Sequence, residues 1–96
     1  MLVVRYSLAS YCLSEMAKLK MYDEAEFTKF RQAIGTRVQA VRKSKGFTQE
    51  KLADITGLDR VAIGYIEQGF RAPRLKSLFI IARALECEVR DFIPHK

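Results

Sequence analysis

The chain has 96 residues, 49% of them hydrophobic and 29% charged, which fits one small globular domain. No apolar run approaches the roughly 18–20 residues that span a bilayer, and serines interrupt the apolar start of the chain, so we expect a cytoplasmic protein without a signal peptide. Residues 1–27 carry three basic and four acidic residues (net −1), and residues 28–96 carry fourteen and seven (net +7). This concentration of positive charge favours a polyanion-binding domain over a merely well-solvated surface.

The sequence offers no candidate for catalysis or metal binding. Cys12 and Cys87 lie far apart and outside any CxxC pair, and His95 lies at the end of the chain. We therefore expect two free, mostly buried thiols, no metal site and no cofactor. Without a nucleophile–base pair, paired acids or a phosphate-binding loop, the pattern does not indicate an enzyme.

Residues 1–22 form an N-terminal extension. Its apolar residues recur at helical spacing and predict a short helix: Leu8, Cys12, Met16 and Leu19. This helix could pack on the domain, pair with a second subunit or hang free; alternatively, Met21 is the true start, because it precedes a complete domain. We assign the domain to residues 23–96.

The first helix of the domain is predicted over residues 24–45. Asp23 and Glu26 have capping-box spacing, and Tyr22 and Phe27 stand at the positions of a hydrophobic staple. One apolar face runs through Phe27, Phe30, Ile34, Val38 and Val41. Basic residues fill the last turn, and Gly46 supplies a left-handed cap.

Two short helices follow, joined by a tight turn. Thr48 is expected to cap the first, with Phe47 and Leu52 as its staple, and Asp59 to cap the second. The turn contains Gly57, which can adopt positive φ, and the small Ala53 suits a close helix crossing. The shared core of the pair is expected to comprise Leu52, Leu58, Ile63 and Ile66. Together these features predict a helix-turn-helix.

The rest of the chain predicts two more helices. Pro73 opens the fourth, whose apolar residues are Leu75, Leu78, Phe79, Ala82 and Leu85. A short fifth contains Val89, Phe92 and Ile93. The stripe through Leu78, Phe79, Ala82 and Leu85 is expected in the core. Because no segment alternates convincingly as a strand apart from Met1–Val4, we predict an all-α, compact bundle of about five helices.

At the level of motifs, the chain resembles the Xre/Cro family of phage-repressor-like helix-turn-helix domains. The resemblance rests on TQEKLADITGLDRVAIGYIEQG followed by RAPRLKSLFIIARALECEVRDFI. The matching positions are Thr48, Gln49, Leu52, Ala53, Gly57, Ile63, Ile66, Glu67, Gly69, Ala82, Ala84 and Leu85. It covers residues 30–93 and implies a five-helix DNA-binding domain that acts as a dimer on a pseudo-palindromic operator.

The resemblance assigns base reading to exposed residues of the third helix. These are Arg60, Val61, Ala62, Gly64 and Tyr65. Arg60 can donate two hydrogen bonds to guanine, whereas Val61 and Ala62 can only pack against a thymine methyl. Gly64 reads nothing but permits a close approach. The alternatives are that Arg60 is simply solvated and that Tyr65 is a partly buried core aromatic.

Phosphate binding is assigned to the start of the second helix and to nearby cations. The candidates are Thr48, Gln49, Arg42, Lys43, Lys45, Arg71, Arg74 and Lys76. Glu67 is expected to be a structural partner of a nearby arginine. Two positions depart from the family pattern: Thr56 stands where an apolar residue is commoner, and Glu86 stands where Gly often ends the fourth helix.

The function predicted from these features is a sequence-specific transcriptional regulator, a repressor that binds double-stranded DNA as a homodimer with its third helix in the major groove. Two alternatives keep the fold and DNA binding: an antitoxin, which would also bind a toxin, and a restriction-modification controller. A further alternative is a protein-interaction module that does not bind DNA.

Overall fold

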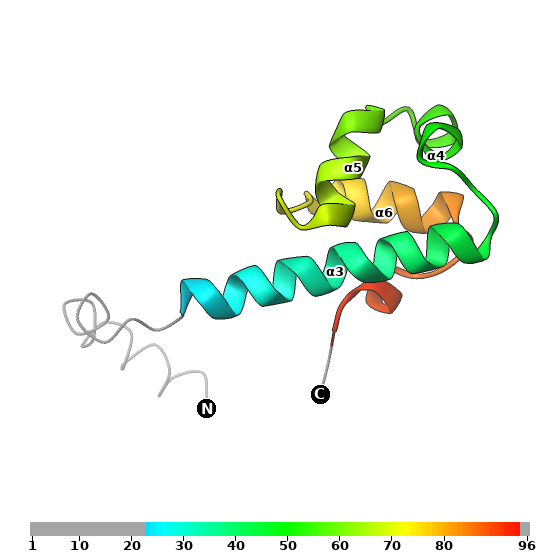
Figure 1. Ribbon diagram of the computed structural model, residues 1–96. Helices are drawn as coiled ribbons and strands as arrows, with labels where there is room; N and C mark the ends of the chain where they lie inside the picture. The colour runs from blue at the N-terminus through cyan, green and yellow to red at the C-terminus, as the bar shows by residue number, and fades with distance from the viewer. Residues whose placement is uncertain (1–22, 95–96) are drawn as a thin grey trace, which may run out of the picture.

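The computed structural model describes residues 23–94 of the chain (Figure 1). The elements are α3 (Glu24–Ser44), α4 (Gln49–Thr56), α5 (Arg60–Gln68), α6 (Leu75–Ala84) and the 3₁₀ turn η1 (Val89–Phe92). No strand occurs within this range. The all-α prediction is therefore confirmed for residues 23–94, while the predicted helix at residues 8–19 and the strand-like Met1–Val4 lie outside the described residues.

The prediction of a fifth α-helix is wrong. Its place is taken by η1, a single 3₁₀ turn over Val89–Phe92 whose start is fixed by a capping box between the N-cap residue Glu88 and Asp91. Ile93 is already extended, at φ −94° and ψ 119°. The following residue is Pro94, and a proline disfavours helical backbone at the residue before it, so the turn cannot continue.

The boundaries of α3 arise from local interactions. Asp23 caps its start, where the carboxylate accepts a hydrogen bond from the N–H of Ala25 at 3.1 Å. Lys45 ends the helix and Gly46 follows at φ 77°, the left-handed conformation expected of it. Acidic residues occupy the first turn and basic ones the last, as the helix dipole favours.

The turn between α4 and α5 is closed by main-chain and hydroxyl hydrogen bonds. Thr48 caps α4 through a 3.0 Å bond from the N–H of Lys51, and Gly57 ends it at φ 78°. The Thr56 hydroxyl donates to the Leu52 carbonyl at 2.7 Å and accepts from the N–H of Leu58 at 3.2 Å. A threonine at this position therefore ties the turn to α4, although it departs from the family pattern.

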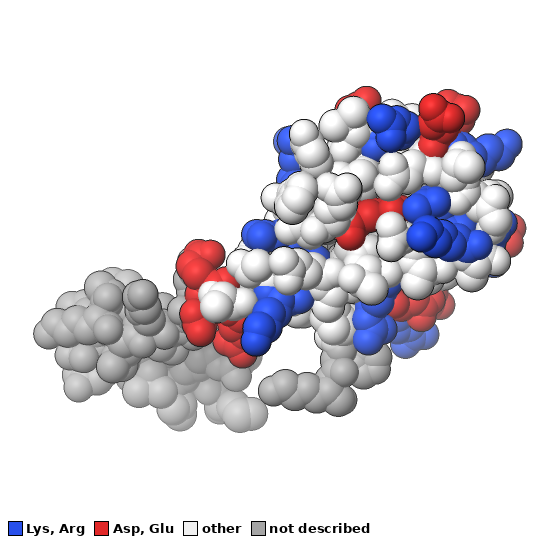
Figure 2. Space-filling model, in the orientation of Figure 1, with Lys and Arg blue, Asp and Glu red and all other residues white. Residues whose placement is uncertain are grey.

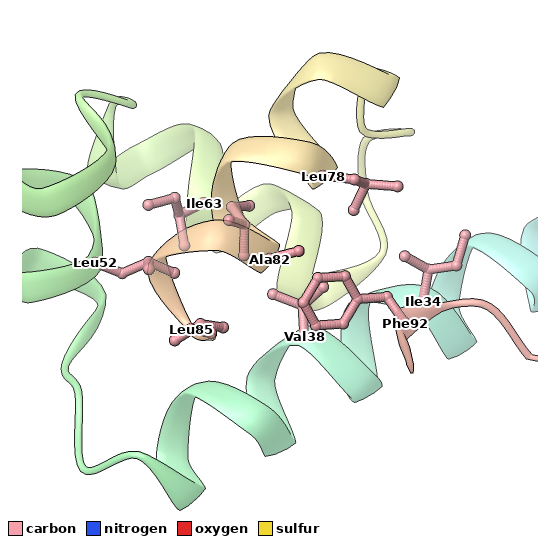
Figure 3. Close-up of a cluster of buried hydrophobic side chains, with 9 residues drawn as sticks. Ile34, Val38, Leu52, Ile63, Leu78, Ala82, Leu85 and Phe92 are labelled. Carbon is pink, nitrogen blue, oxygen red and sulfur yellow. The ribbon is translucent and has the colours of Figure 1, made fainter. Parts of the chain in front are cut away.

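All five elements contribute to one hydrophobic core (Figure 3). α5 packs on both α3 and α4, α6 packs on α4, and η1 folds back onto α3. The buried members of the core are Ile34, Val38, Leu52, Ile63, Leu78, Ile81, Ala82, Leu85 and Phe92. Ala53 and Leu58 are partly buried against this cluster, so the helix-turn-helix core lies where the sequence placed it.

At Gly35 the backbone of α3 lies close against the backbone of α5. A Cβ at this position would collide with the carbonyl oxygen of Ile66 and lie 2.7 Å from that of Glu67. No side chain can therefore replace the hydrogen of Gly35 without moving one of the two helices. No local feature of the sequence requires glycine here, so the reason for Gly35 is tertiary.

Phe79, which we expected in the core, is exposed, and so are three other apolar side chains of the predicted helix faces. Phe79 is 52% exposed, and Leu75, in the first turn of the same helix, is 74% exposed. Phe27 and Phe30 are 41% and 40% exposed, because the first turns of α3 precede the part of the helix that α5 and η1 cover. The apolar stripes of α3 and α6 are thus longer or wider than the surfaces that pack against them.

Cys87 is a free, partly buried thiol, as expected. Burial raises the pKa of this thiol, and the Asp91 carboxylate raises it further. Within residues 23–94, no group of His, Cys, Asp and Glu side chains could hold a metal ion. The same range contains no helix long and apolar enough to cross a membrane.

Candidate nucleic-acid interface

The outward surface of α5 carries the residues expected to read bases. Arg60, Val61 and Tyr65 are exposed, whereas Ala62 and Gly64 are partly buried. The opposite side of the helix is fixed by buried Ile63, Ile66 and Glu67. Asp59 occupies the N-cap position but makes no side-chain capping bond, so the first backbone N–H groups of α5 are not satisfied by that carboxylate.

Gln49 connects the start of α4 to the start of α5. Its Oε1 accepts a hydrogen bond from Arg60 Nη1 at 3.4 Å, and its Nε2 donates to Glu67 Oε1 at 3.0 Å. Gly64 leaves room for this amide, since a Cβ there would lie 3.6 Å from Oε1. The structure thus joins one phosphate candidate, Gln49, to the first base-reading candidate, Arg60.

A buried ion pair anchors this arrangement. The guanidinium of Arg42 donates to both Glu67 oxygens, at 2.6 Å from Nε and 3.0 Å from Nη2, and to the Phe47 carbonyl at 2.7 Å. The Arg42 and Glu67 side chains are only 7% and 0% exposed. Glu67 is therefore the structural partner that the sequence suggested.

The same geometry corrects the expected role of Arg42. We expected its side chain on the surface, as a phosphate contact in the last turn of α3. Instead all three guanidinium nitrogens donate to groups inside the domain, and the residue is 6% exposed. The reason is long-range: α5 brings a carboxylate over α3, and a buried carboxylate needs a bidentate partner.

Tyr65 and Arg71 form a second grouping at the other end of α5. The Arg71 guanidinium lies 4.9 Å from the centre of the Tyr65 ring, and the Phe70 ring lies 6.3 Å from it at a tilt of 53°. Tyr65 is 39% exposed, so it is a surface aromatic rather than a core one. The cation and the ring hold each other at the surface, at the C-terminal half of α5.

Arg71 and Arg74 also line a hollow together with residues of α5. The hollow lies between α5 and the start of α6 and is lined by Ala62, Ile66, Arg71, Ala72, Pro73, Arg74 and Ser77. The structure therefore brings Ala62, a base-reading candidate, next to two phosphate candidates. A hollow with two guanidinium groups at its wall suits an anionic oxygen.

The remaining cations lie apart from this grouping. Lys43 lies in the last turn of α3 and Lys45 is its C-cap, and both are exposed. Lys45 Nζ lies 3.9 Å from Glu86 Oε1, an exposed and weak ion pair. Lys76 is exposed on the first turn of α6. Figure 2 shows basic side chains at the end of α3, both basic and acidic ones over α4, and an acidic group at the start of α3.

Known proteins match the same part of the chain. The helix-turn-helix family model matches residues 38–92, more than half of the chain. This chain belongs to the Xre/Cro-like helix-turn-helix family. It is a DNA-binding transcriptional regulator of that family, which confirms the resemblance drawn from the motif.

Among curated relatives, the control protein C.SmaI of Serratia marcescens is 35% identical over 70 residues, which cover 73% of this chain and 83% of C.SmaI. Among solved structures, the restriction-modification controller C.AhdI of Aeromonas hydrophila has a TM-score of 0.63 and 37% identity, over 65% of this chain and 94% of C.AhdI. The biofilm regulator SinR, solved in complex with DNA, has a TM-score of 0.59 and 27% identity, over 62% of this chain and 95% of SinR.

In this helix-turn-helix regulator, sequence reasoning missed three residues that hold the recognition helix. Gly35 admits α5, as described above. Gln39 Nε2 lies 3.4 Å from Glu67 Oε1, and Arg31 Nε donates to the Gly69 carbonyl at 2.6 Å. These contacts join residues 28 and 38 positions apart in the chain. A sequence period reports a helix face but not its partner, so no local signal identified them.

Proposed function

We propose that the protein binds a pseudo-palindromic operator as a homodimer, with α5 in the major groove of each half-site. The observation that carries this proposal is the contact of Gln49 with Arg60. It places the long, charged side chain at the start of α5 on a fixed support, and the first residues of a recognition helix are those nearest base edges. Arg60 would donate to guanine O6 and N7.

The rest of the outward face gives α5 a limited reading capacity. Val61 is 46% exposed and would pack against a thymine methyl, and Tyr65 would reach a base or a phosphate. Ala62 and Gly64 allow close approach and donate nothing. With few polar readers, part of the specificity would come from DNA shape and deformability.

Phosphate contacts would flank α5 on two sides. On one side, the backbone N–H groups of Thr48 and Gln49 lie at the start of α4 and would donate to a phosphate, because a helix N-terminus favours an anion. On the other side lie Arg71, Arg74 and Lys76, around and beyond the hollow next to Ala62. Lys43 and Lys45 would contact DNA phosphates further from α5. Arg42 is not included, because it is committed to Glu67.

The dimer would form through the groove between α4 and α6. Ile55 and Phe79 are 47% and 52% exposed there, and the groove is completed by Thr56, Ile80, Arg83 and Ala84. Exposed apolar side chains of this size mark contact surfaces. The groove uses the end of α4 and the second half of α6, whereas the reading surface uses the starts of α4 and α5. A two-fold contact here would leave both recognition helices free.

A restriction-modification controller is the specific candidate that the relatives favour. C.AhdI is named a restriction-modification controller protein and is 37% identical to this chain, and C.SmaI is named a control protein and is 35% identical. For this chain, the candidate predicts an operator next to genes for a restriction endonuclease and a methyltransferase. Binding confined to DNA away from such genes, or their absence from the neighbourhood, would exclude it.

Selection of bound sequences from a random DNA pool tests the proposed function directly. With the full chain, we expect an enriched inverted repeat whose half-sites lie about one helical turn apart, and a salt dependence typical of several phosphate contacts. The matched control is the Arg60→Ala variant, for which the guanine preference should relax. Recovery of no motif, or of a single isolated half-site, would overturn the proposal.

A further inference from the structure

The start of α3 carries an apolar face that no other element covers among residues 23–94. Phe27 and Phe30 are 41% and 40% exposed, and with Asp23 and Glu26 they line a shallow hollow. Glu26, Phe27 and Phe30 follow Asp23 by three, four and seven positions, so all four residues share one side of the helix. All of them belong to α3 or its cap.

This face continues the buried face of α3. Ile34 and Val38 follow Phe30 at intervals of four and are 6% and 0% exposed, because α5 and η1 pack on that part of the helix. Arg31 lies 5.8 Å from the centre of the Phe27 ring, but its Nε donates to the Gly69 carbonyl at 2.6 Å. Arg31 is thereby fixed and shields only one side of the aromatic pair.

We propose that residues 8–19 of the same chain pack on this face as a helix antiparallel to α3. The chain enters α3 at Asp23, so residues 20–22 tether this segment beside the hollow. A connection of this length is usual in a hairpin of two helices. An antiparallel register around it would place Met16 opposite Phe27 and Cys12 near Phe30, and sulfur atoms pack well against aromatic rings.

Charge favours this occupant. Residues 1–22 carry Arg5, Lys18 and Lys20 against Glu15, a net charge of +2. The cap and first turn of α3 carry Asp23, Glu24 and Glu26, and Figure 2 shows this acidic group at the boundary of the described residues. Lys18 and Lys20 would lie beside it. A contact of this face with itself in a second copy would oppose like charges.

A disulfide experiment in the full chain tests the register. In a Cys87→Ala background, native Cys12 is the partner for Phe30→Cys, and Lys29→Cys, about 100° around α3 from Phe30 and outside the apolar face, is the matched control. Under mild oxidation we expect the Phe30→Cys variant to form a disulfide within one chain at least about tenfold faster than the Lys29→Cys variant. Equal rates, or disulfides formed mainly between two chains, would overturn the proposal.

Hydrogen exchange supplies a test without new cysteines. In the unmodified chain, the amides of residues 8–19 should exchange at least about tenfold more slowly than in an unstructured peptide. The Phe27→Ser, Phe30→Ser double variant should lose that protection while α5 and α6 keep theirs, and Leu75→Ser, another exposed apolar site, should change neither. Unprotected amides at residues 8–19 in the unmodified chain would refute the proposal even if the variants fail to fold.

Discussion

Gln49 Nε2 donates to the buried carboxylate of Glu67 at 3.0 Å, and this bond decides which way the Gln49 amide faces. A carboxylate only accepts, so the amide nitrogen must point toward Glu67 and the amide oxygen away from it. That oxygen meets Arg60 Nη1 at 3.4 Å, and a guanidinium only donates. The interior of the domain thereby orients a side chain at the proposed DNA surface.

The ion pair beneath Gln49 should be essential for stability. Glu67→Gln leaves the Arg42 guanidinium buried without a counter-charge, so we expect the free energy of unfolding in urea to fall by about 3–5 kcal/mol. The control Glu50→Gln, exposed in the first turn of α4, should cost below about 1 kcal/mol. A cost at Glu67 no larger than that at Glu50 would show that the pair contributes little.

Replacing Arg60 and replacing Arg74, both proposed to contact DNA, should have different effects on DNA binding. Arg60→Ala removes a base contact and should cost about 1–3 kcal/mol at the selected operator, with little loss on random DNA. Arg74→Ala removes a phosphate contact and should weaken all sequences alike. In a gel-shift titration over salt concentration, it should reduce the slope of log K against log salt by about one. If both variants behave identically, the assigned roles are incorrect.

The two glycines within helices should respond oppositely to alanine. Gly35→Ala drives a methyl group into the backbone of α5, and we expect about 3 kcal/mol of destabilisation, at the upper end of the range for overpacked sites. Gly64→Ala places its methyl 3.6 Å from the Gln49 amide, an ordinary contact, and should stabilise the free protein by about 1 kcal/mol. Thermal unfolding of the pair measures both signs; a neutral Gly35→Ala would contradict the close crossing.

Glu86 is a site for stabilisation. It follows α6 at φ 58°, a left-handed conformation that costs a residue with a side chain about 1–2 kcal/mol. Glu86→Gly should therefore raise the free energy of unfolding by about 1 kcal/mol. The control Lys45→Ala removes the same 3.9 Å ion pair without changing the backbone and should cost below about 0.5 kcal/mol. A loss of stability in Glu86→Gly would mean that the Glu86 side chain makes a contribution larger than this strain.

The proposed dimer groove predicts a change in assembly. Phe79→Asp introduces a charge into the apolar contact and should raise the dimer dissociation constant at least about tenfold in sedimentation experiments. Leu75→Asp, on the same helix but outside the groove, should leave it unchanged. Half-site binding should survive in the Phe79→Asp monomer, because the groove and the reading surface are separate. Unaltered assembly would move the dimer contact elsewhere.

The sequence by itself determined the helices and their joints, because caps, turn glycines and apolar periods act over a few residues. Asp23, Thr48 and Gly57 end or begin helices as predicted, and Leu52, Ile63 and Leu85 are buried as their spacing indicated. The prediction of a fifth α-helix was wrong because Pro94 disfavours helical backbone at Ile93, and this effect outweighed the apolar spacing.

Only the tertiary structure decided what each helix face meets. Arg42 and Glu67 form an ion pair although they are 25 residues apart in the chain. Gly35 has no room for a side chain solely because α5 crosses α3 there. Phe79 and Phe27 are exposed for the same reason. An apolar period identifies the face of a helix, but it does not say over what length another helix covers that face. Whether a side chain is buried depends on two packed surfaces, whereas a local sequence pattern describes only one of them.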